Sequence, residues 1–334
     1  MFPRRRRTDK MAYNQIVYQR AKAELEARRK KAEKENDARR VKAISLCPEI
    51  ARVEGEIASY GLDAVKALGM GGAAEKYIRE LSVNSLAAQD RKKQLLRSIG
   101  LEEDYLDIKY TCPVCKDTGS HNGYFCDCQK KEVINQAKAL LSETAPLKSS
   151  TFEKFSLSYY PDVIDPQLGV SQREHMSSVY NFCRDYANHF TKKAQGLTMY
   201  GGTGLGKTHL SLAIANVVIE RGYDVYYGSV QSIMEQLEKE HFGRKTNDES
   251  EKEAIVNADL LIIDDLGVEF VTQFTIASLH DILNSRMLKG LPTIISTNLE
   301  MDEIYEKYTQ RIASRLFGSS LPLAFCGRDI RQIK

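Results

Sequence analysis

A short motif between an apolar segment and an amphipathic one constrains the fold of this chain more than any other feature. Residues 201–208 read G-G-T-G-L-G-K-T and fit the phosphate-loop pattern G-x-x-x-x-G-K-[S/T]. The segment Leu197–Tyr200 before the motif is expected to be a strand, and Lys207–Arg221 after it a helix. A glycine-rich turn without a ligand would rarely fall between a strand and a helix. We therefore predict a phosphate-binding loop made of Gly201, Gly202, Thr203, Gly204, Leu205, Gly206, Lys207 and Thr208.

The chemistry of such a loop is suited to a nucleoside triphosphate and its Mg²⁺ ion. The glycines let backbone N–H groups close around phosphate oxygens, and the start of the following helix adds a partial positive charge. Lys207 is expected to reach the β- and γ-phosphates, and the Thr208 hydroxyl to ligate Mg²⁺. The motif therefore predicts ATP and Mg²⁺ as cofactors and an ATPase activity.

Two carboxylates follow a second apolar segment. Leu260–Ile263 is expected to be a buried strand that presents Asp264 and Asp265 at its carboxyl end, where parallel sheets bind ligands. We expect Asp264 to hold Mg²⁺, directly or through water, and Asp265 to activate the attacking water. ATPases of this class usually carry a glutamate at the second position, so Glu269 is an alternative base. A pair of helix-capping acids is the competing interpretation.

The remaining pattern from Gln195 onward alternates strands and helices, which predicts a parallel sheet covered on both faces. Thr293–Ser296 is expected to be another strand, and Leu321–Phe325 a final one. Asn298 follows the former and would lie beside the γ-phosphate, where it could orient water. A Thr-Asn pair also begins turns well, so Asn298 is open to a purely structural interpretation.

Three arginines near the C-terminus are candidates for contact with the phosphates. Arg311 and Arg315 are four residues apart on one face of a predicted helix. Either could reach the nucleotide of a neighbouring subunit, and Arg315 is preferred. Arg331 could contact the nucleotide of its own subunit. A solvent-exposed arginine without a ligand is the alternative for each.

Four of the seven cysteines are close together in the sequence. Cys112 and Cys115 form a C-x-x-C pair, and Cys126 and Cys128 a C-x-C pair, which together can surround one Zn²⁺ ion. So short a segment cannot build its own apolar core, so a structural zinc ion would supply its folding energy. His121 could replace one thiolate, and redox cysteines or an iron–sulfur cluster are alternatives. Cys47, Cys183 and Cys326 are interpreted as ordinary small apolar residues.

Charge is distributed unevenly between the first residues and the rest. Residues 1–42 carry 15 Lys or Arg and 6 acidic residues, a net charge of +9, whereas the remainder carries −6. A basic arm favours an acidic partner such as nucleic acid or an acidic protein surface, although a solvated helix without a partner has the same composition. No segment is apolar enough to span a membrane, no signal sequence is expected, and clustered cysteines favour a reducing compartment, so a cytoplasmic protein is predicted.

The chain divides into five regions on these patterns. We predict a basic helical arm, a helical partner-binding region, a zinc-binding module, a helix with a linker, and an ATPase domain, at 1–42, 43–105, 106–130, 131–166 and 167–334.

Four segments together resemble the bacterial replicative helicase-loader family of the DnaC/DnaI type, to which the transposition ATPase IstB is related. They are GGTGLGKTHL (201–210), LLIIDDLG (260–267), PTIISTN (292–298) and RIASRLFG (311–318). The cysteine segment and the following FEKFSLSYYP resemble the zinc-bearing, DnaI-like members.

The resemblance implies an α/β fold: an AAA+ P-loop parallel sheet that lacks a C-terminal helical lid, preceded by a helical N-terminal domain with the zinc module. It also implies self-association of ATPase domains, binding of single-stranded DNA, and an N-terminal domain that binds the replicative helicase. Asn298 would then be sensor 1, Arg315 the arginine finger and Arg331 sensor 2.

Three functions are compatible with these features. The first is an ATP-dependent loader that delivers the hexameric replicative DNA helicase onto single-stranded DNA. The second is a transposition ATPase that coats duplex DNA and recruits a transposase, against which the cysteine module argues. The third is a zinc-dependent nucleic-acid adaptor that binds the nucleotide without hydrolysing it.

Overall fold

The computed structural model describes residues 14–67, 74–166, 169–241, 243 and 250–332. The chain forms two compact units, one of residues 22–129 and one that combines the residues up to 21 with those from 130 onward. The arginine-rich start of the predicted basic arm lies outside the described residues. No described helix is both long and apolar enough to cross a membrane.

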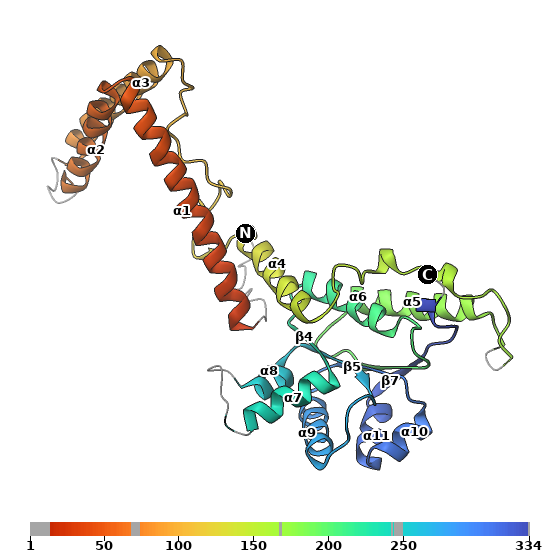
Figure 1. Ribbon diagram of the computed structural model, residues 1–334. Coiled ribbons are helices and arrows are strands. Elements are labelled where there is room, and N and C mark those ends of the chain that lie inside the picture. The colour runs from red at the N-terminus through yellow and green to blue at the C-terminus, as the bar shows by residue number, and fades with distance from the viewer. Residues whose placement is uncertain (1–13, 68–73, 167–168, 242, 244–249, 333–334) are drawn as a thin grey trace, which may run out of the picture. The chain divides into compact units, whose positions relative to one another are not determined.

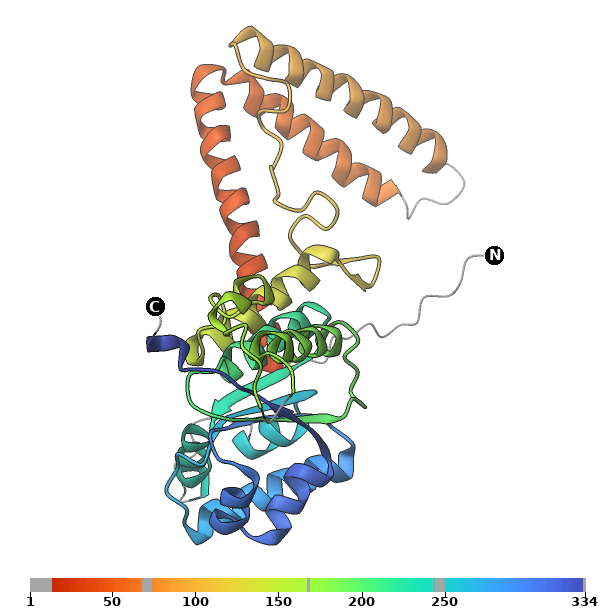
Figure 2. The same ribbon diagram turned by 90° about the vertical axis from the view of Figure 1, so that its right-hand side faces the viewer.

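The unit of residues 22–129 is mainly helical. Helix α1 (Gln15–Leu46) enters it from Lys22 onward, and α2 (Glu49–Ala67) and α3 (Ala74–Ser98) lie side by side as an antiparallel hairpin (Figures 1 and 2). Its core is small: Ala43, Ile50, Leu96 and Leu106 are buried together. The antiparallel strands β1 (Ser120–His121) and β2 (Tyr124–Phe125) follow.

The long first helix buries some of its side chains. It runs from Gln15 to Leu46, and its Leu25, Ala32 and Ala43 side chains are buried. Small alanine side chains allow a helix to approach neighbouring segments closely, which a count of large apolar residues does not detect.

The other unit is built around a five-stranded parallel sheet, as predicted. The spatial order is β4-β5-β6-β3-β7, so the strand before the phosphate loop lies between β6 and β7. The strands are β3 (Gly196–Tyr200), β4 (Val225–Ser229), β5 (Leu260–Leu266), β6 (Thr293–Thr297) and β7 (Ser320–Ala324).

Helices cover both faces of this sheet (Figure 1). One apolar cluster joins the helices between residues 127 and 220 to the face that carries Leu260 and Ile262. A second joins the helices between residues 230 and 318 to the opposite face, which carries Leu261 and Ile263. Successive side chains of a strand point to opposite faces of the sheet. Because helices cover both faces, β5 begins with four consecutive apolar residues.

The helices of this unit begin and end at recognisable local signals. The Thr272 hydroxyl accepts the Thr275 N–H (3.1 Å) at the start of α9, and Gly290 ends that helix in the left-handed conformation. These helices are α4 (Asp127–Thr144), α5 (Gln172–Asn188), α6 (Lys207–Glu220), α7 (Val230–His241), α8 (Glu251–Asn257), α9 (Gln273–Lys289), α10 (Met301–Lys307) and α11 (Gln310–Gly318).

Three short 3-10 helices complete the described structure, and two of them follow α4. They are η2 (Phe152–Lys154), η3 (Leu157–Tyr159) and η4 (Ile330–Gln332). After β7 the described residues include one further helix, the 3-10 helix η4.

Candidate nucleotide site and cysteine cluster

The phosphate loop joins β3 to α6 in a conformation that requires glycine. Gly201 has a φ of 126°, and a Cβ there would lie 2.3 Å from the Phe325 carbonyl oxygen. Gly206, the N-cap of α6, has a φ of 89°, and its Cβ would lie 2.8 Å from the Phe155 ring. Both positions combine a left-handed backbone with close approach, so side chains are excluded and the backbone N–H groups are left accessible.

Lys207 lies at the centre of this loop and is 5% exposed. Its ammonium group donates to the carbonyl oxygens of Gly201 (2.6 Å) and Gly202 (2.7 Å) and to Oδ1 of Asn298 (2.7 Å). Burial lowers the pKa of Lys207 to about 8, against the opposing influence of the Asp265 and Asp264 carboxylates. The structure thus brings together two residues that the sequence predicted for the same site.

Asp264 connects the loop to the next part of the site. It is 4% exposed, and its Oδ1 accepts the Thr208 hydroxyl at 3.1 Å. Oδ1 also accepts the hydroxyl of Ser296, and Oδ2 accepts the Tyr227 hydroxyl at 2.7 Å. Tyr227 lies on β4 and Ser296 on β6, and neither was among the site residues predicted from the sequence.

Asp265, near the end of β5, and Asn298, just after β6, lie at the same edge of the sheet. Asp265 has a φ of 55°, and its N–H donates to Ser296 Oγ (3.0 Å) at an irregularity in the pairing of β5 with β6. Burial, followed by the Asp264 charge, raises the pKa of the Asp265 carboxyl. A proton acceptor is therefore held beside Lys207 and Asn298 in the same cavity.

Glu269, the alternative base, is buried in a different set of contacts. Its Oε2 accepts the Gly267 N–H at 2.8 Å, and its Oε1 accepts the Tyr308 hydroxyl. One oxygen is therefore engaged by the turn that follows β5 and the other by the residue that follows α10, and Glu269 does not line the cavity at the phosphate loop.

A cavity of about 510 Å³ opens over the phosphate loop. One wall is formed by residues 149–159, which the sequence indicated only as a linker with aromatic anchors. The Tyr160 hydroxyl donates to the Leu205 carbonyl (2.8 Å), and the Phe155 ring stacks at 5.9 Å on Tyr160 and at 5.6 Å on Tyr180. This segment therefore belongs to the candidate nucleotide site, with its rings packed against the loop.

The candidate arginines lie at different places around the sheet. Arg331 lines the same cavity as Lys207, and its neighbour Ile330 donates its N–H to the Gly204 carbonyl (3.1 Å). Arg315 lines a separate cavity of about 340 Å³, together with residues at the starts of β3, β6 and β7. Arg311 lines a third cavity beside α9.

The position of Arg315 limits which nucleotide it could contact. Parallel strands begin at one edge and end at the other, and five residues span about 16 Å. Its guanidinium donates to Asn284 Oδ1 (2.9 Å) near the starting edge, whereas the phosphate loop follows the end of β3. Arg315 is thus separated by the sheet from the phosphate loop of its own chain.

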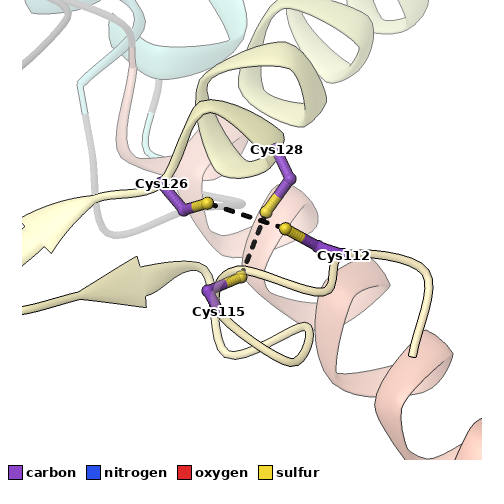
Figure 3. A group of neighbouring side chains, drawn as sticks. All are labelled: Cys112, Cys115, Cys126 and Cys128. Carbon is purple, nitrogen blue, oxygen red and sulfur yellow. Dashed lines mark hydrogen bonds between the residues drawn. The ribbon is translucent and has the colours of Figure 1, made fainter. Parts of the chain in front are cut away.

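The four clustered cysteines converge on one point in the other unit (Figure 3). The sulfurs of Cys112 and Cys126 are 3.7 Å apart, those of Cys115 and Cys128 are 3.3 Å apart, and all four lie within 4.8 Å of one another. Tetrahedral zinc with Zn–S bonds of about 2.3 Å implies sulfur separations of about 3.8 Å. The cluster fits a Cys₄ zinc site, and His121 does not belong to it.

The electrostatics of the cluster also favour a cation. The Cys115 backbone N–H lowers the pKa of Cys112 to about 7, whereas burial and the neighbouring thiols raise the pKa of Cys128. Thiolates this close repel one another, so a bound cation is needed to keep all four deprotonated together.

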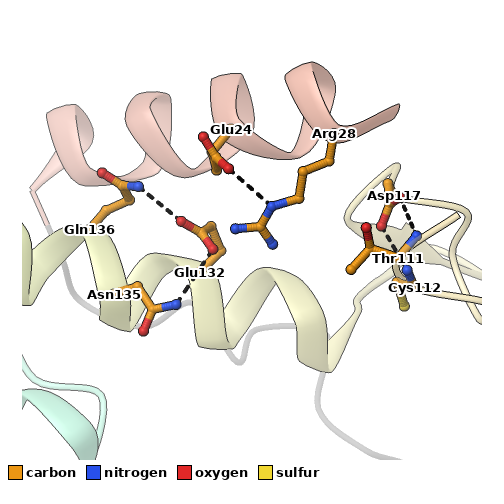
Figure 4. A network of polar contacts seen from close by, with 8 residues as sticks. All are labelled: Glu24, Arg28, Thr111, Cys112, Asp117, Glu132, Asn135 and Gln136. Atoms are coloured by element: carbon orange, nitrogen blue, oxygen red, sulfur yellow. Dashed lines mark hydrogen bonds and ion pairs between the residues drawn. The ribbon is translucent and has the colours of Figure 1, made fainter. Parts of the chain in front are cut away.

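Asp117 fixes the turn that carries the first cysteine pair (Figure 4). The side chain is 2% exposed, and its two oxygens accept the N–H groups of Thr111 and Cys112, both at 2.8 Å. Asp117 itself has a φ of 57°. Asp117 was not among the residues predicted from the sequence, although an Asp directly after a C-x-x-C-x turn is a signal of such capping.

Glu132 is a buried acid close to the cysteine cluster in sequence, and neighbours on its own helix donate to it. On α4, Oε1 of the buried Glu132 accepts from Gln136 (2.9 Å) and Oε2 from Asn135 (3.5 Å), as Figure 4 shows. The cysteines outside the cluster are partly or fully buried, in keeping with the prediction for Cys47, Cys183 and Cys326.

The residues around the candidate nucleotide site are similar to those of known proteins. Residues 184–314 match the family described as IstB-like ATP binding protein. The replicative helicase loader DnaC of Escherichia coli (strain K12) is 29% identical over 143 residues, which cover 42% of this chain and 58% of DnaC. The replicative helicase loader DnaI of Bacillus subtilis (strain 168) is 24% identical over 265 residues, covering 70% of this chain and 80% of DnaI.

Solved structures with a similar arrangement include one titled "Crystal structure of the DnaC helicase loader". Its TM-score is 0.45 at 19% identity, and the match covers 54% of this chain and 99% of that chain. The match to the DnaC sequence spans only 58% of that relative's length. The resemblance drawn from the four sequence segments is confirmed by the family match and by the two loader sequences.

Proposed function

We propose that this protein is an ATP-dependent helicase loader, because residues 184–314 match the IstB-like ATP binding protein family and the chain is similar in sequence to the DnaC and DnaI helicase loaders. It would bind the hexameric replicative DNA helicase and deliver it onto single-stranded DNA. The extent of the DnaI similarity supports this proposal. The similarity covers 70% of the chain. The sheet-containing unit, residues 1–21 and 130–334, is a smaller share of the chain than this. The similarity therefore extends into the helical unit that bears the cysteines.

The nucleotide would be held by the residues already in contact around the phosphate loop. The Lys207 ammonium would exchange its contacts with neutral oxygens for phosphate oxygens, and Asn298 would remain beside it. Thr208 and Asp264 would hold Mg²⁺, which when bound offsets the negative charge of the phosphates.

Hydrolysis would depend on Asp265, with Asn298 orienting the attacking water. The raised pKa of the Asp265 carboxyl makes it a better proton acceptor than a solvated aspartate. Arg331 would contact the phosphates of its own chain, and Arg315 those of a neighbouring copy, because its own site lies across the sheet. The ATPase domain is therefore expected to self-associate, and turnover to be slow without partners.

Zinc is proposed as the structural ion of the cysteine cluster. Cys112, Cys115, Cys126 and Cys128 would supply all four ligands, which leaves no open position for catalysis. The metal content of the purified full-length protein tests this assignment. Zinc at one equivalent per chain supports it, whereas iron or no metal contradicts it.

Co-purification tests the loader proposal. The full-length chain is mixed with the replicative helicase of its own cell in the presence of ATP, and complex formation is followed by size-exclusion chromatography. Helicase transfer onto single-stranded DNA is then measured as strand unwinding. We expect a complex and ATP-dependent transfer, and the absence of any complex would refute the proposal.

The variant Lys207→Ala distinguishes the role of ATP binding from that of helicase binding. This variant should keep the complex with the helicase and lose transfer, since the phosphate contact is removed far from the helical unit in sequence. Normal transfer by a variant that binds no ATP would instead favour a zinc-dependent adaptor.

The IstB-like family match supports a second candidate, a transposition ATPase that coats duplex DNA and recruits a transposase. An ATP-dependent filament on duplex DNA, formed without any helicase, would favour it. Electron microscopy of the full-length protein on duplex and on single-stranded DNA distinguishes the two candidates.

A further inference from the structure

Three hydroxyl groups from three different elements meet at one buried carboxylate. Asp264 accepts from Thr208 at the start of α6, from Tyr227 on β4 and from Ser296 on β6. Thr208 belongs to the phosphate loop, but Tyr227 and Ser296 belong to no part of the predicted site. A carboxylate that is 4% exposed and surrounded by donors has a fixed orientation, so its partners determine where its free lone pair points.

The sheet register explains how Tyr227 reaches Asp264. Tyr227 pairs with Ile262 across β4 and β5, and Asp264 is the second residue after Ile262. Side chains two residues apart on a strand share a face, so Tyr227 and Asp264 are diagonal neighbours on the same face. The Tyr227 hydroxyl donates to Asp264 Oδ2 at 2.7 Å across this diagonal.

Ser296 contacts the Asp264 carboxylate from β6, which lies on the other side of β5 from β4. Its hydroxyl donates to Asp264 Oδ1 and accepts the Asp265 N–H at 3.0 Å. It is fully buried on β6, the strand that leads to Asn298. One hydroxyl therefore connects both acidic residues to the strand beside Lys207.

The Asp264 carboxylate has one acceptor position that no hydroxyl occupies. An ionised carboxylate has about four acceptor positions, two on each oxygen. Oδ1 accepts two hydroxyls and Oδ2 accepts one, so one position on Oδ2 is left. Tyr227 occupies the other position on that oxygen and thereby determines the direction of the free one.

We propose that Tyr227 and Ser296 are positioning residues that orient Asp264 toward the divalent cation of a bound nucleotide. The inference rests on the proposed ATP-binding function and deepens it, since it assigns the metal affinity of the site to strands β4 and β6 as well as to the phosphate loop. Outer hydrogen-bond partners of metal ligands contribute about 10–100-fold to metal affinity.

The test measures binding rather than turnover. A fluorescent, slowly hydrolysed ATP analogue is titrated onto the full-length protein at a series of Mg²⁺ concentrations and, separately, in excess EDTA. Tyr227→Phe removes one hydroxyl and keeps the ring. We expect its Mg²⁺ midpoint to rise about tenfold, while the affinity in EDTA stays that of the unaltered protein.

Tyr226→Phe is the matched control. Tyr226 is the neighbouring residue on β4 and faces the other side of the sheet, where its hydroxyl donates to Gln236 Oε1 at 2.9 Å and to Glu251. This variant loses the same group from the same strand, and its Mg²⁺ midpoint should equal that of the unaltered protein.

Ser296 supplies a second pair of variants. Ser296→Ala should raise the Mg²⁺ midpoint at least as much as Tyr227→Phe, because it also removes the acceptor of the Asp265 N–H. Ser296→Thr retains the hydroxyl and should restore the midpoint. A melting curve of each variant establishes that it is folded before its affinity is compared.

The outcomes separate the inference from the function on which it rests. If the unaltered protein binds no ATP analogue with or without Mg²⁺, the proposed function fails. If it binds with a clear Mg²⁺ midpoint that neither Tyr227→Phe nor Ser296→Ala shifts, the inference alone is overturned. An equal loss of affinity in Mg²⁺ and in EDTA also overturns it, because the role would then be structural.

Discussion

The cysteine cluster and the nucleotide site are built on opposite principles. All four sulfurs of the cluster come from residues 112–128, and the turn between them is fixed by a neighbour, Asp117. The nucleotide site draws on residues from Ser149 to Arg331 and on strands that are not adjacent in sequence. One site is specified by local chain geometry and the other by packing.

The difference extends to what stabilises each site. The nucleotide site lies between two extensive apolar clusters that cover the faces of the sheet. The largest apolar core described within the helical unit has four buried residues, none of which belongs to the segment between the cysteines. A local site without its own core depends on its ligand for stability, whereas a site on a sheet persists without one.

Metal removal is the largest expected effect and tests this contrast directly. Structural zinc contributes about 10–16 kcal/mol to small domains, so a strong chelator should unfold the segment around β1 and β2. Hydrogen exchange should show full loss of protection there and unchanged protection in β3 and β5. Retained protection around β1 and β2 after complete metal loss would refute the contrast.

Arg286 tests how far packing stabilises the sheet-containing unit. Its guanidinium, 1% exposed, donates to four carbonyl oxygens, those of Ile255, Val256, Ala258 and Pro292, at 2.6–3.2 Å. Each orphaned buried acceptor costs about 1–3 kcal/mol, so Arg286→Leu should lower the free energy of unfolding of this unit by at least about 3 kcal/mol.

Chemical denaturation followed by circular dichroism measures the loss. Arg221→Leu is the control, because the Arg221 guanidinium donates to one carbonyl oxygen, that of Ala187 at 2.9 Å, and should cost about 1 kcal/mol. Zinc content should be the same in both variants. A stability loss for Arg286→Leu no greater than for the control would show that the carbonyls find other partners.

The variant Asp117→Asn tests whether the local turn beside the cysteine cluster determines its affinity for zinc. The amide replaces one acceptor oxygen by a donor that faces the N–H of Thr111 or Cys112. The affinity for zinc should fall about 10–100-fold, as measured by competition with a chromogenic chelator. Asp104→Asn removes the same charge from an exposed side chain, which pairs with Lys109 at 3.7 Å, and should leave the affinity unchanged.

The smallest expected effect concerns pH at the nucleotide site. The pKa of Lys207 is lowered to about 8, so the ammonium is fully charged below that pH and loses its proton above it. ATP affinity should therefore be constant below about pH 8 and fall by up to about tenfold per pH unit above it. Lys207→Arg stays protonated throughout and should abolish this dependence, whatever its absolute affinity.

Particular residues show how far sequence reasoning extends. The phosphate loop, Asp264 and the cysteine pairs were recognisable because each motif fixes its own backbone direction within a few residues. Tyr227, Ser296 and Phe155 were not, because their roles arise only when strands β4, β5 and β6 and the segment after α4 are brought together. Likewise, the sequence placed Arg311 and Arg315 on one helical face but could not show that they line different cavities.

The sequence by itself determined which residues have the right chemistry for ligands: a glycine-rich loop suited to phosphates, two acids suited to a metal ion and four thiols suited to a second one. These features follow from residues adjacent in the chain, whose spacing sets where their functional groups point. Only the tertiary structure decided which side chains support them, because strand order and packing place Tyr227, Ser296 and Arg331 near groups that are distant in sequence.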